Sequence, residues 1–470
     1  MTNGSSVERL AALLRARAAT LPPGGQLPST RDLMAAHGVG PGTVSRAIGL
    51  LGAEGVLVTE AGRGTFVSRR PARREPDTGW QTVALGEAPV DSRAVAALLA
   101  PAAPGALVLS SGYPSPDLQP LAALAAAATR AARRPGGWAL APPAGLPELR
   151  QLLATPVGAD AGDVLVVPGG QAGLSTALRA LTRPGAAVLV EVPTYLGALA
   201  TARAAGLRPV PVPTDGGGVR ADLLPEAFAS SGARLLYLQP TYANPTGTVL
   251  AHARRAPVLE AARQAGAFVL EDDWARHLAL DGPAPPPLVH DDDDGRVVHL
   301  SSLSKAGAPS LRIGALIARG PAAARLAALR QVDDFGVARP LQETAVELLG
   351  SPAWPRHLGQ LARALRARRD HLVGELHRHL PELAPRTAPA GGLHLWLTLP
   401  TGTDDVELAD RARSRRLLVG AGRPYFVSEP PGPRLRVGFA AADRTQLTAG
   451  VRLLAETLSG EPASGFVTGD

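Results

Sequence analysis

Short apolar runs recur through the middle of the chain, and most end at a polar or glycine-containing segment. The runs are Val164–Val167, Ala187–Val192, Leu235–Gln239, Ala267–Leu270 and Val297–Leu300. Helical patterns rich in Ala, Arg and Leu separate them. Apolar strands alternating with helices are typical of a mainly parallel sheet that is covered on both faces. The sequence therefore predicts an α/β domain whose site residues lie at strand ends.

The length of 470 residues favours more than one globular unit, because single cores stop growing near ~250–300 residues. We predict a first domain over residues 1–70, a linker rich in Arg, Pro and Ala over 71–104, a large domain over 105–458 and a tail over 459–470. The chain has no cysteine and no apolar stretch long enough to span a bilayer, and residues 1–10 lack a signal-peptide pattern. We expect a cytoplasmic protein without a membrane segment, and we assign no metal site.

Positive charge is concentrated at the beginning of the chain. Residues 1–75 hold ten arginines and five acidic residues, a net charge of +5 out of +7 for the whole protein. Lys305 is the single lysine, so 47 of the 48 basic residues are arginines. The first part of the chain is therefore expected to bind a polyanion, and the lone lysine is expected to have a specific role.

The first domain is predicted to contain a helix that ends before Pro22, two further short helices and a hairpin. Ser29 caps a helix that stops at Gly38, and Gly40 with Pro41 opens a second helix after a three-residue turn. Two short β-strand patterns then flank the turn 62–64. These elements predict a winged helix-turn-helix.

The stretch from Leu27 to Val67 closely resembles the winged helix-turn-helix of GntR-type bacterial regulators. One departure is the segment 40–42, Gly-Pro-Gly, where the family usually has a base-reading arginine, so direct readout is expected to be reduced and shape readout increased. In so arginine-rich a chain, Arg46 and Arg63 taken alone are equally well explained as solvated cations. The resemblance implies that double-stranded DNA is contacted by Arg31, Thr43, Arg46, Arg63 and Gly64.

Lys305 follows the apolar run Val297–Leu300 in the sequence Ser-Ser-Leu-Ser-Lys, with Arg312 seven residues further on. A lysine that forms a Schiff base must be desolvated and lie near other cations, so that its amine is unprotonated. Hydroxyls and a guanidinium beside it suit an aldehyde that bears a phosphate. Without further motifs, an ordinary surface lysine is the simpler explanation.

Four further motifs support such a site, although each has a structural explanation of its own. The glycines of segment 166–171 can present helix N-terminal amides to a phosphate. Asp272 can keep a pyridine nitrogen protonated, or cap a helix. Asn244 can donate to a phenolate oxygen, or form a turn. Tyr195 can stack on an aromatic cofactor, or pack in the core.

In this order, the motifs resemble fold-type I aminotransferases dependent on pyridoxal 5'-phosphate, from about residue 105 to 458. The resemblance implies that Lys305 binds the cofactor aldehyde, Asp272 the pyridine nitrogen and Asn244 the ring oxygen, while Tyr195 stacks on the ring. Arg436 matches the arginine that binds an amino acid carboxylate, with its neighbour Arg434 as the rival candidate. The implied phosphate ligands are Gly170, Gln171, Ser302, Ser304 and Arg312.

Three positions depart from that pattern. Trp274 stands where the family has a tyrosine, and Gly170 stands where it has a phosphate-loop serine. Leu140 replaces the tyrosine that begins the usual dimer-interface stretch and reaches the partner's phosphate. These three changes suggest that the cofactor is retained while turnover is not optimised.

A GntR-type head joined to an aminotransferase-like body resembles the MocR family of bacterial regulators. The resemblance implies a homodimer that binds DNA and senses a small amino-group effector, which is an amino acid, another amine or a vitamin B6 compound. An active aminotransferase with an accessory DNA-binding domain is the alternative. A third hypothesis is a DNA-binding protein that binds no cofactor. Such a protein would lack the visible absorbance of bound pyridoxal phosphate.

Overall fold

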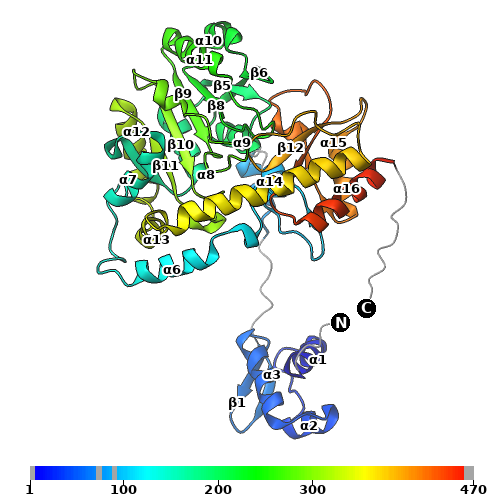
Figure 1. Cartoon of the computed structure of the whole chain (residues 1–470). Helices are drawn as coiled ribbons and strands as arrows, with labels where there is room; N and C mark the ends of the chain where they lie inside the picture. The colour runs from blue at the N-terminus through cyan, green and yellow to red at the C-terminus, as the bar shows by residue number, and fades with distance from the viewer. Residues whose placement is uncertain (1–5, 70–76, 87–92, 460–470) are drawn as a thin grey trace. The chain divides into compact units, whose positions relative to one another are not determined.

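The computed structural model of the chain describes residues 6–69, 77–86 and 93–459 (Figure 1). The chain divides into two compact units, Met1–Ala88 and Pro89–Asp470. Residues 460–470, which make up almost all of the predicted tail, lie outside the described residues. Each unit is described by itself below.

The amino-terminal unit contains a winged helix-turn-helix, as the sequence predicted. The hairpin strands pair antiparallel, from Leu57 opposite Val67 to Glu60 opposite Gly64. Leu14 of the first helix packs with Val44 and Leu51 of the third in one small apolar core. The elements are α1 (Ser6–Thr20), α2 (Thr30–His37), α3 (Pro41–Ala53), β1 (Leu57–Glu60) and β2 (Gly64–Val67).

The predicted helix ends are confirmed in detail. The Ser29 side chain accepts a hydrogen bond from Asp32 N, and the Asp32 carboxylate accepts one from Ser29 N, so the two residues form a capping box at α2. Gly38 ends α2 in the left-handed conformation, at a φ of +61°. Gly40 caps α3 and Pro41 occupies its first turn.

Two helices form within the segment 71–104, where the sequence showed no sustained periodicity. They are α4 (Gly79–Leu85) and α5 (Arg93–Leu99). α4 buries none of its residues, and Trp80 and Val83 on it are largely exposed. A helix without a buried face has no apolar periodicity to predict it from. The rest of the segment includes residues 71–76 and 87–92, which lie outside the described residues.

The second unit is built on an eight-stranded sheet with the order β4-β11-β10-β9-β8-β5-β6-β7. The strands β10, β9, β8, β5 and β6 are parallel, β11 runs antiparallel to both of its neighbours, and β7 is antiparallel to β6. The strands are β4 (Val164–Val167), β5 (Ala187–Val192), β6 (Arg208–Asp215), β7 (Gly218–Val219), β8 (Leu235–Leu238), β9 (Phe268–Asp273), β10 (Val297–Ser302) and β11 (Gly314–Ile317). The predicted α/β class with a mainly parallel sheet is therefore confirmed.

Helices cover both faces of this sheet, which explains its continuous apolar strands. Tyr237 of β8 packs in the same apolar cluster as residues of α8 (Gly170–Leu181), α9 (Leu196–Ala204) and α12 (Gly320–Asp334). Its neighbour Leu236 faces the opposite side, with α10 (Leu224–Ser231) and α11 (His252–Ala265). Leu270 and Asp272 of β9 follow the same alternation, so Asp272 is directed to the face that carries α8.

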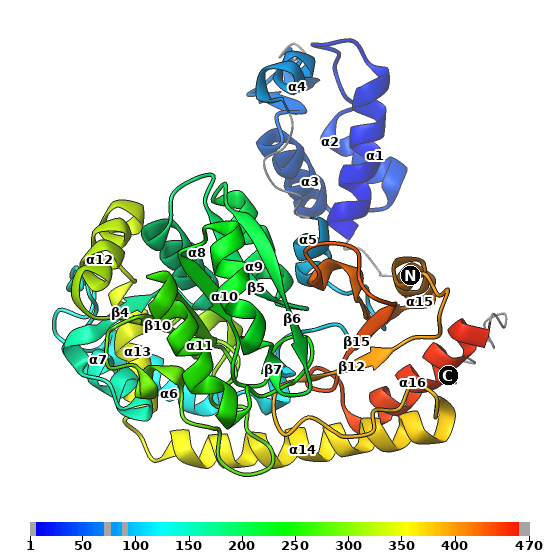
Figure 2. The same cartoon turned by 90° about the horizontal axis from the view of Figure 1, so that it is seen from above.

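A smaller antiparallel sheet has the order β12-β15-β14. The helix α14 runs along the length of the unit, from the side of α13 to α16 (Figures 1 and 2). Among the described residues no helix is long and apolar enough to cross a membrane. The remaining elements are β3 (Leu107–Val108), α6 (Leu121–Ala132), α7 (Pro147–Ala154), α13 (Arg339–Leu349), α14 (Ala353–His379), β12 (His394–Thr398), α15 (Asp405–Ser414), β13 (Leu417–Leu418), β14 (Gly420–Ala421), β15 (Arg434–Gly438) and α16 (Arg444–Ser459).

Candidate cofactor and ligand site

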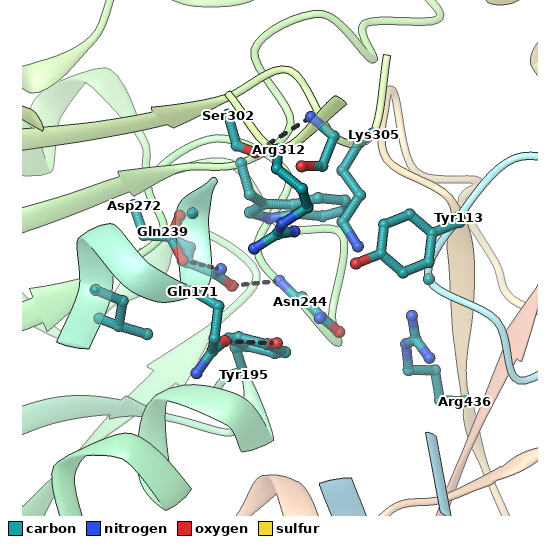
Figure 3. Close-up of a pocket in the computed structure, with 15 residues that line it drawn as sticks. Tyr113, Gln171, Tyr195, Gln239, Asn244, Asp272, Ser302, Lys305, Arg312 and Arg436 are labelled. Carbon is teal, nitrogen blue, oxygen red and sulfur yellow. Dashed lines mark hydrogen bonds between the residues drawn. The ribbon is translucent and has the colours of Figure 1, made fainter. Parts of the chain in front are cut away.

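One pocket collects every residue that the sequence assigned to the cofactor and the ligand carboxylate (Figure 3). The strands β4, β5, β8, β9 and β10 point the same way, so the segments that follow them meet at one edge of the sheet. The predicted residues that line the pocket are Gly170, Gln171, Tyr195, Asn244, Asp272, Trp274, Ser302, Ser304, Lys305, Arg312 and Arg436. Gly112, Tyr113, Leu174 and Gln239 complete the lining.

The phosphate candidates surround the amino-terminal end of α8. Gly169 has a φ of +85°, and a Cβ added there would lie 2.8 Å from the Arg312 guanidinium carbon, so glycine lets the guanidinium approach. Arg312 Nη2 donates a hydrogen bond of 2.8 Å to the carbonyl of Pro168. The Ser304 hydroxyl is buried without a hydrogen-bond partner among the described residues. A helix N-terminus, a guanidinium and a free hydroxyl together suit a phosphate.

Asp272 is buried at the end of β9 and is held by two donors. Tyr237 donates a hydrogen bond of 2.7 Å and Gln239 one of 2.8 Å, both to the same oxygen, Oδ2. Burial raises the pKa of the Asp272 carboxyl, while these two hydrogen bonds and the charges of His299 and Lys305 oppose that rise. A protonated pyridine nitrogen would add a further positive charge beside this carboxylate.

Asn244 and Tyr195 are held by glutamine side chains. The backbone N–H of Asn244 donates a hydrogen bond of 2.9 Å to Gln239 Oε1, so Gln239 links Asn244 to Asp272 (Figure 3). The Tyr195 hydroxyl donates a hydrogen bond of 3.1 Å to Gln171 Oε1. The side-chain amide of Gln171 donates one of 2.6 Å to the Thr201 hydroxyl. The Gln171 side chain therefore orients Tyr195. Only the backbone amide of Gln171 remains for the predicted phosphate contact.

Lys305 lies beside Tyr113, with Nζ 3.5 Å from the centre of the phenol ring. Burial lowers the pKa of its ammonium to about 7, and the charges of Arg436 and Arg312 act in the same direction, while Asp272 opposes them. A methyl group added at Gly112 would lie 3.4 Å from Lys305 Nζ and 3.6 Å from Arg436 Nη2. The amine and the guanidinium thus approach the same point of the pocket.

The structure separates the two rival arginines of β15. Arg436 is buried and lines the pocket, whereas Arg434 does not line it and donates a hydrogen bond to the carbonyl of Pro433. Of the two predicted candidates, only Arg436 therefore lies in the pocket.

The three departures also have definite surroundings. Trp274 lines the pocket, and its indole Nε1 is buried without a hydrogen-bond partner among the described residues. A Cβ added at Gly170 would lie 3.4 Å from the Ser302 Cβ, so a side chain at this position would be in van der Waals contact with Ser302. Leu140 lies outside the pocket and is 81% exposed on the surface of the chain.

The DNA-contact candidates lie on three elements of the amino-terminal unit. Arg31 on α2 and Arg46 on α3 are exposed, while Thr43 at the start of α3 is half-buried. Arg63 is exposed between β1 and β2, paired with Glu60 and 5.8 Å from the Phe66 ring centre. Gly64 has a φ of +120°, and a Cβ there would lie 2.8 Å from Gln26 Nε2, so the wing requires glycine at this position.

Sequence reasoning missed Tyr113, Gln239, Tyr237 and His394. A signal existed for two of them, because Gln239 ends the run from Leu235 just before Pro240, and Gly112-Tyr113-Pro114 comes two serines after the apolar segment 106–109. Tyr237 and His394 lie inside strands, where a polar or aromatic residue is more simply explained by packing.

Comparison with known proteins identifies both domains. Residues 105–454 match the family model of aminotransferase class I and II, and residues 7–67 match that of bacterial regulatory proteins of the gntR family. An uncharacterized HTH-type transcriptional regulator, YisV of Bacillus subtilis, is 29% identical over 92% of this chain and 91% of its own length. The chain belongs to the MocR family. This MocR-family protein is therefore a regulator of the DNA-binding kind that carries an aminotransferase-like domain.

Enzymes are also among the relatives of this MocR-family chain. The 2-aminoadipate transaminase of Thermus thermophilus is 31% identical over 76% of the chain and 91% of the enzyme. The crystal structure of LysN, an alpha-aminoadipate aminotransferase from Thermus thermophilus complexed with N-(5'-phosphopyridoxyl)-L-leucine, has a TM-score of 0.74 and 30% identity, covering 79% of this chain and 95% of LysN. The cofactor of this fold family is pyridoxal 5'-phosphate, and the unpartnered Ser304 hydroxyl and Trp274 indole beside Lys305 fit a phosphate-bearing, polar ring.

Proposed function

We propose that this MocR-family protein is a transcriptional regulator whose pocket senses a small amino-group ligand, which is an amino acid, another amine or a vitamin B6 compound. The observation that carries the proposal is the approach of Lys305 and Arg436 to one point beside Gly112. An amino acid carries an amine, which would compete with Lys305 for the cofactor aldehyde, and on the same carbon a carboxylate, which Arg436 could bind.

Lys305, Asp272, Asn244 and Tyr195 would hold the ring of pyridoxal phosphate, while the α8 end, Ser302, Ser304 and Arg312 would hold its phosphate. When bound, the cofactor supplies an aldehyde that reacts with amino groups and a ring that withdraws electrons. Lys305 is suited to its part because its lowered pKa leaves much of the amine unprotonated near neutral pH. The contacts of these pocket residues would then differ between the protein with a bound ligand and the protein without one.

Regulation requires that the ligand bind one arrangement of the protein better than another. We propose that the protein acts on double-stranded DNA in the cytoplasm, through Arg31, Thr43, Arg46, Arg63 and Gly64.

We further propose a homodimer, supported by an exposed apolar surface on the second unit. Residues 335–336 adjoin Pro143, since a Cβ at Gly336 would lie 3.7 Å from the Pro143 carbonyl oxygen. Leu140 precedes Pro143, so the predicted interface stretch lies near the end of α12. Large apolar side chains left in water favour association with a second copy. The exposed apolar residues of these segments are Trp138, Leu140, Val332 and Phe335.

The second candidate function is an active aminotransferase that carries an accessory DNA-binding domain. Lys305, Asp272 and Arg436 are present, and enzyme relatives favour this alternative. The replacements at Trp274, Leu140 and Gly170 count against efficient turnover, because each removes a hydroxyl that the family uses.

The deciding experiment measures DNA binding and cofactor absorbance on the same purified chain. Lys305→Ala is expected to remove the visible absorbance of the lysine-bound cofactor and the response of DNA binding to amines, while basal DNA affinity stays the same. An undiminished ligand response in Lys305→Ala would contradict the proposal. Repeated turnover of an amino acid with an α-keto acid by the unmodified chain would instead support the aminotransferase.

A further inference from the structure

Arg436 is a buried cation whose side-chain hydrogen bonds go to neutral groups. Its side chain is 2% exposed. Nη1 donates a hydrogen bond of 2.9 Å to the carbonyl of Ser110, and Nη2 donates one of 3.3 Å to His394 Nδ1. Nε has no hydrogen-bond partner among the described residues. No ion pair joins Arg436 to a carboxylate within the described part of the chain. A desolvated guanidinium without an anion is costly, so this arrangement favours an anionic ligand.

His394 accepts one of this guanidinium's hydrogen bonds, and the guanidinium carbon also lies 5.9 Å from the centre of the Tyr425 ring. His394 lies on β12 opposite Gly438 of β15, and its side chain is buried. Burial lowers the pKa of the imidazole well below its ordinary value, and the charges of Arg436 and Lys305 lower it further. The ring is therefore neutral, and because Nδ1 accepts from Arg436, the ring proton is on Nε2. A neutral acceptor orients Arg436 without using up its charge.

Trp274 is an aromatic neighbour of this imidazole. The two rings are stacked, with centroids 5.9 Å apart and planes inclined by 13°. Flat packing against the indole restricts rotation of the imidazole, which keeps Nδ1 directed at Arg436. Trp274, which stands where the family has a tyrosine, thus packs against His394.

We propose that His394 is a positioning residue that orients Arg436 for a ligand carboxylate and so makes the pocket prefer amino acids over amines without a carboxylate. The inference rests on the proposed amine-binding function, since it names the ligand class of that same pocket. A free guanidinium can rotate about its side chain, whereas one fixed by Ser110 and His394 presents its remaining N–H groups in one direction.

The test compares full-length, cofactor-loaded chains carrying His394→Phe or His394→Asn with the unmodified chain. Phenylalanine keeps a ring against Trp274 but has no acceptor, whereas the asparagine oxygen can replace Nδ1. Binding of 3-phenylpropanoate, an acid without an amine, is measured by titration calorimetry. The visible absorbance of the cofactor reports L-phenylalanine and 2-phenylethylamine, which differ only in the carboxylate.

We expect His394→Phe to bind 3-phenylpropanoate about tenfold or more weakly, the effect of one hydrogen bond to a charged group. His394→Asn should stay close to the unmodified chain, and the response to 2-phenylethylamine should be the same in all three. Unchanged acid affinity in His394→Phe, or no acid binding by the unmodified chain, would overturn the proposal. His394→Met, which also lacks an acceptor, replaces the phenylalanine variant if that variant loses its cofactor absorbance.

The experiment also separates this inference from the proposed function. If the unmodified chain binds the acid and His394→Phe does not, while neither amine changes the absorbance, amine sensing is wrong and the assignment of His394 stands. If the amines change the absorbance but acid affinity is independent of residue 394, sensing stands and the assignment of His394 is wrong.

Discussion

Gln239 donates a hydrogen bond of 2.8 Å from Nε2 to Oδ2 of Asp272. Because this carboxylate is buried, each donor that it loses makes its ionised form less favourable. Gln239→Leu should therefore weaken binding of pyridoxal phosphate to the cofactor-free chain by about tenfold, as expected from loss of a charged hydrogen bond of about 1.5 kcal/mol. Absorbance titration measures this affinity.

Tyr237→Phe is the matched comparison for that prediction, since it removes the other donor to Oδ2 and hardly changes the volume of the side chain. We expect a similar loss of affinity, and a larger one when both substitutions are combined. Wild-type affinity in both single variants would show that these donors do not hold Asp272 for the cofactor.

The pKa of Lys305, lowered to about 7, predicts the pH dependence of cofactor binding. The unprotonated amine is the reactive form, and it becomes the major form above the pKa. The rate at which the cofactor-free chain takes up pyridoxal phosphate should therefore rise through pH 7 and level off above it. Stopped-flow absorbance between pH 5.5 and pH 9 checks this, and a rate still rising steeply at pH 9 would contradict it.

Arg436→Met provides a control of the electrostatic cause. The Arg436 guanidinium repels the Lys305 ammonium and so lowers its pKa. Removal of that charge should raise the pKa and move the midpoint of the uptake rate to higher pH. A midpoint that stays at the same pH would leave burial and the charge of Arg312 as the causes of the lowered pKa.

The wing depends on glycine at position 64. An alanine there would have to adopt a φ of +120° and would displace the Gln26 amide, which donates 3.0 Å to the Arg63 carbonyl. Gly64→Ala should destabilise the amino-terminal unit by about 1–3 kcal/mol. Differential scanning calorimetry measures the change. Gly49→Ala, in open space on α3, should instead stabilise it slightly, by about 0.5–1 kcal/mol.

Arg46 is predicted to contact the operator from α3. Arg46→Ala should weaken operator binding and lower the slope of log affinity against log salt by about 1 if the contact is to a phosphate. Cofactor absorbance should not change. Fluorescence anisotropy at several salt concentrations tests this, with Arg17→Ala on α1 as a charge-matched control. Equal losses in the two variants would point to general electrostatics instead of a contact at Arg46.

The sequence alone determined the two domains and most of the residues that line the pocket. Caps at Ser29 and Gly38 and the apolar runs before Asp272 and Lys305 are local patterns, which depend only on residues a few positions apart. Since the carboxyl ends of parallel strands meet at one edge, strand-end motifs predicted many of the residues that gather there, although Gln239 after β8 was missed. The helix α4 could not be predicted in this way, because it buries no face.

Only the tertiary structure decided which residues support these groups. Gln239 reaches Asp272 because β8 and β9 pair in one register, with Tyr237 opposite Leu270. Tyr113 lies over Lys305, and His394 contacts Arg436, although each pair is separated by many residues. Such contacts depend on strand order and register, which are properties of the whole packed chain and leave no periodic pattern in the sequence. Most residues that line the pocket could thus be named from the sequence, but their protonation and orientation are set by neighbours that only the fold brings together.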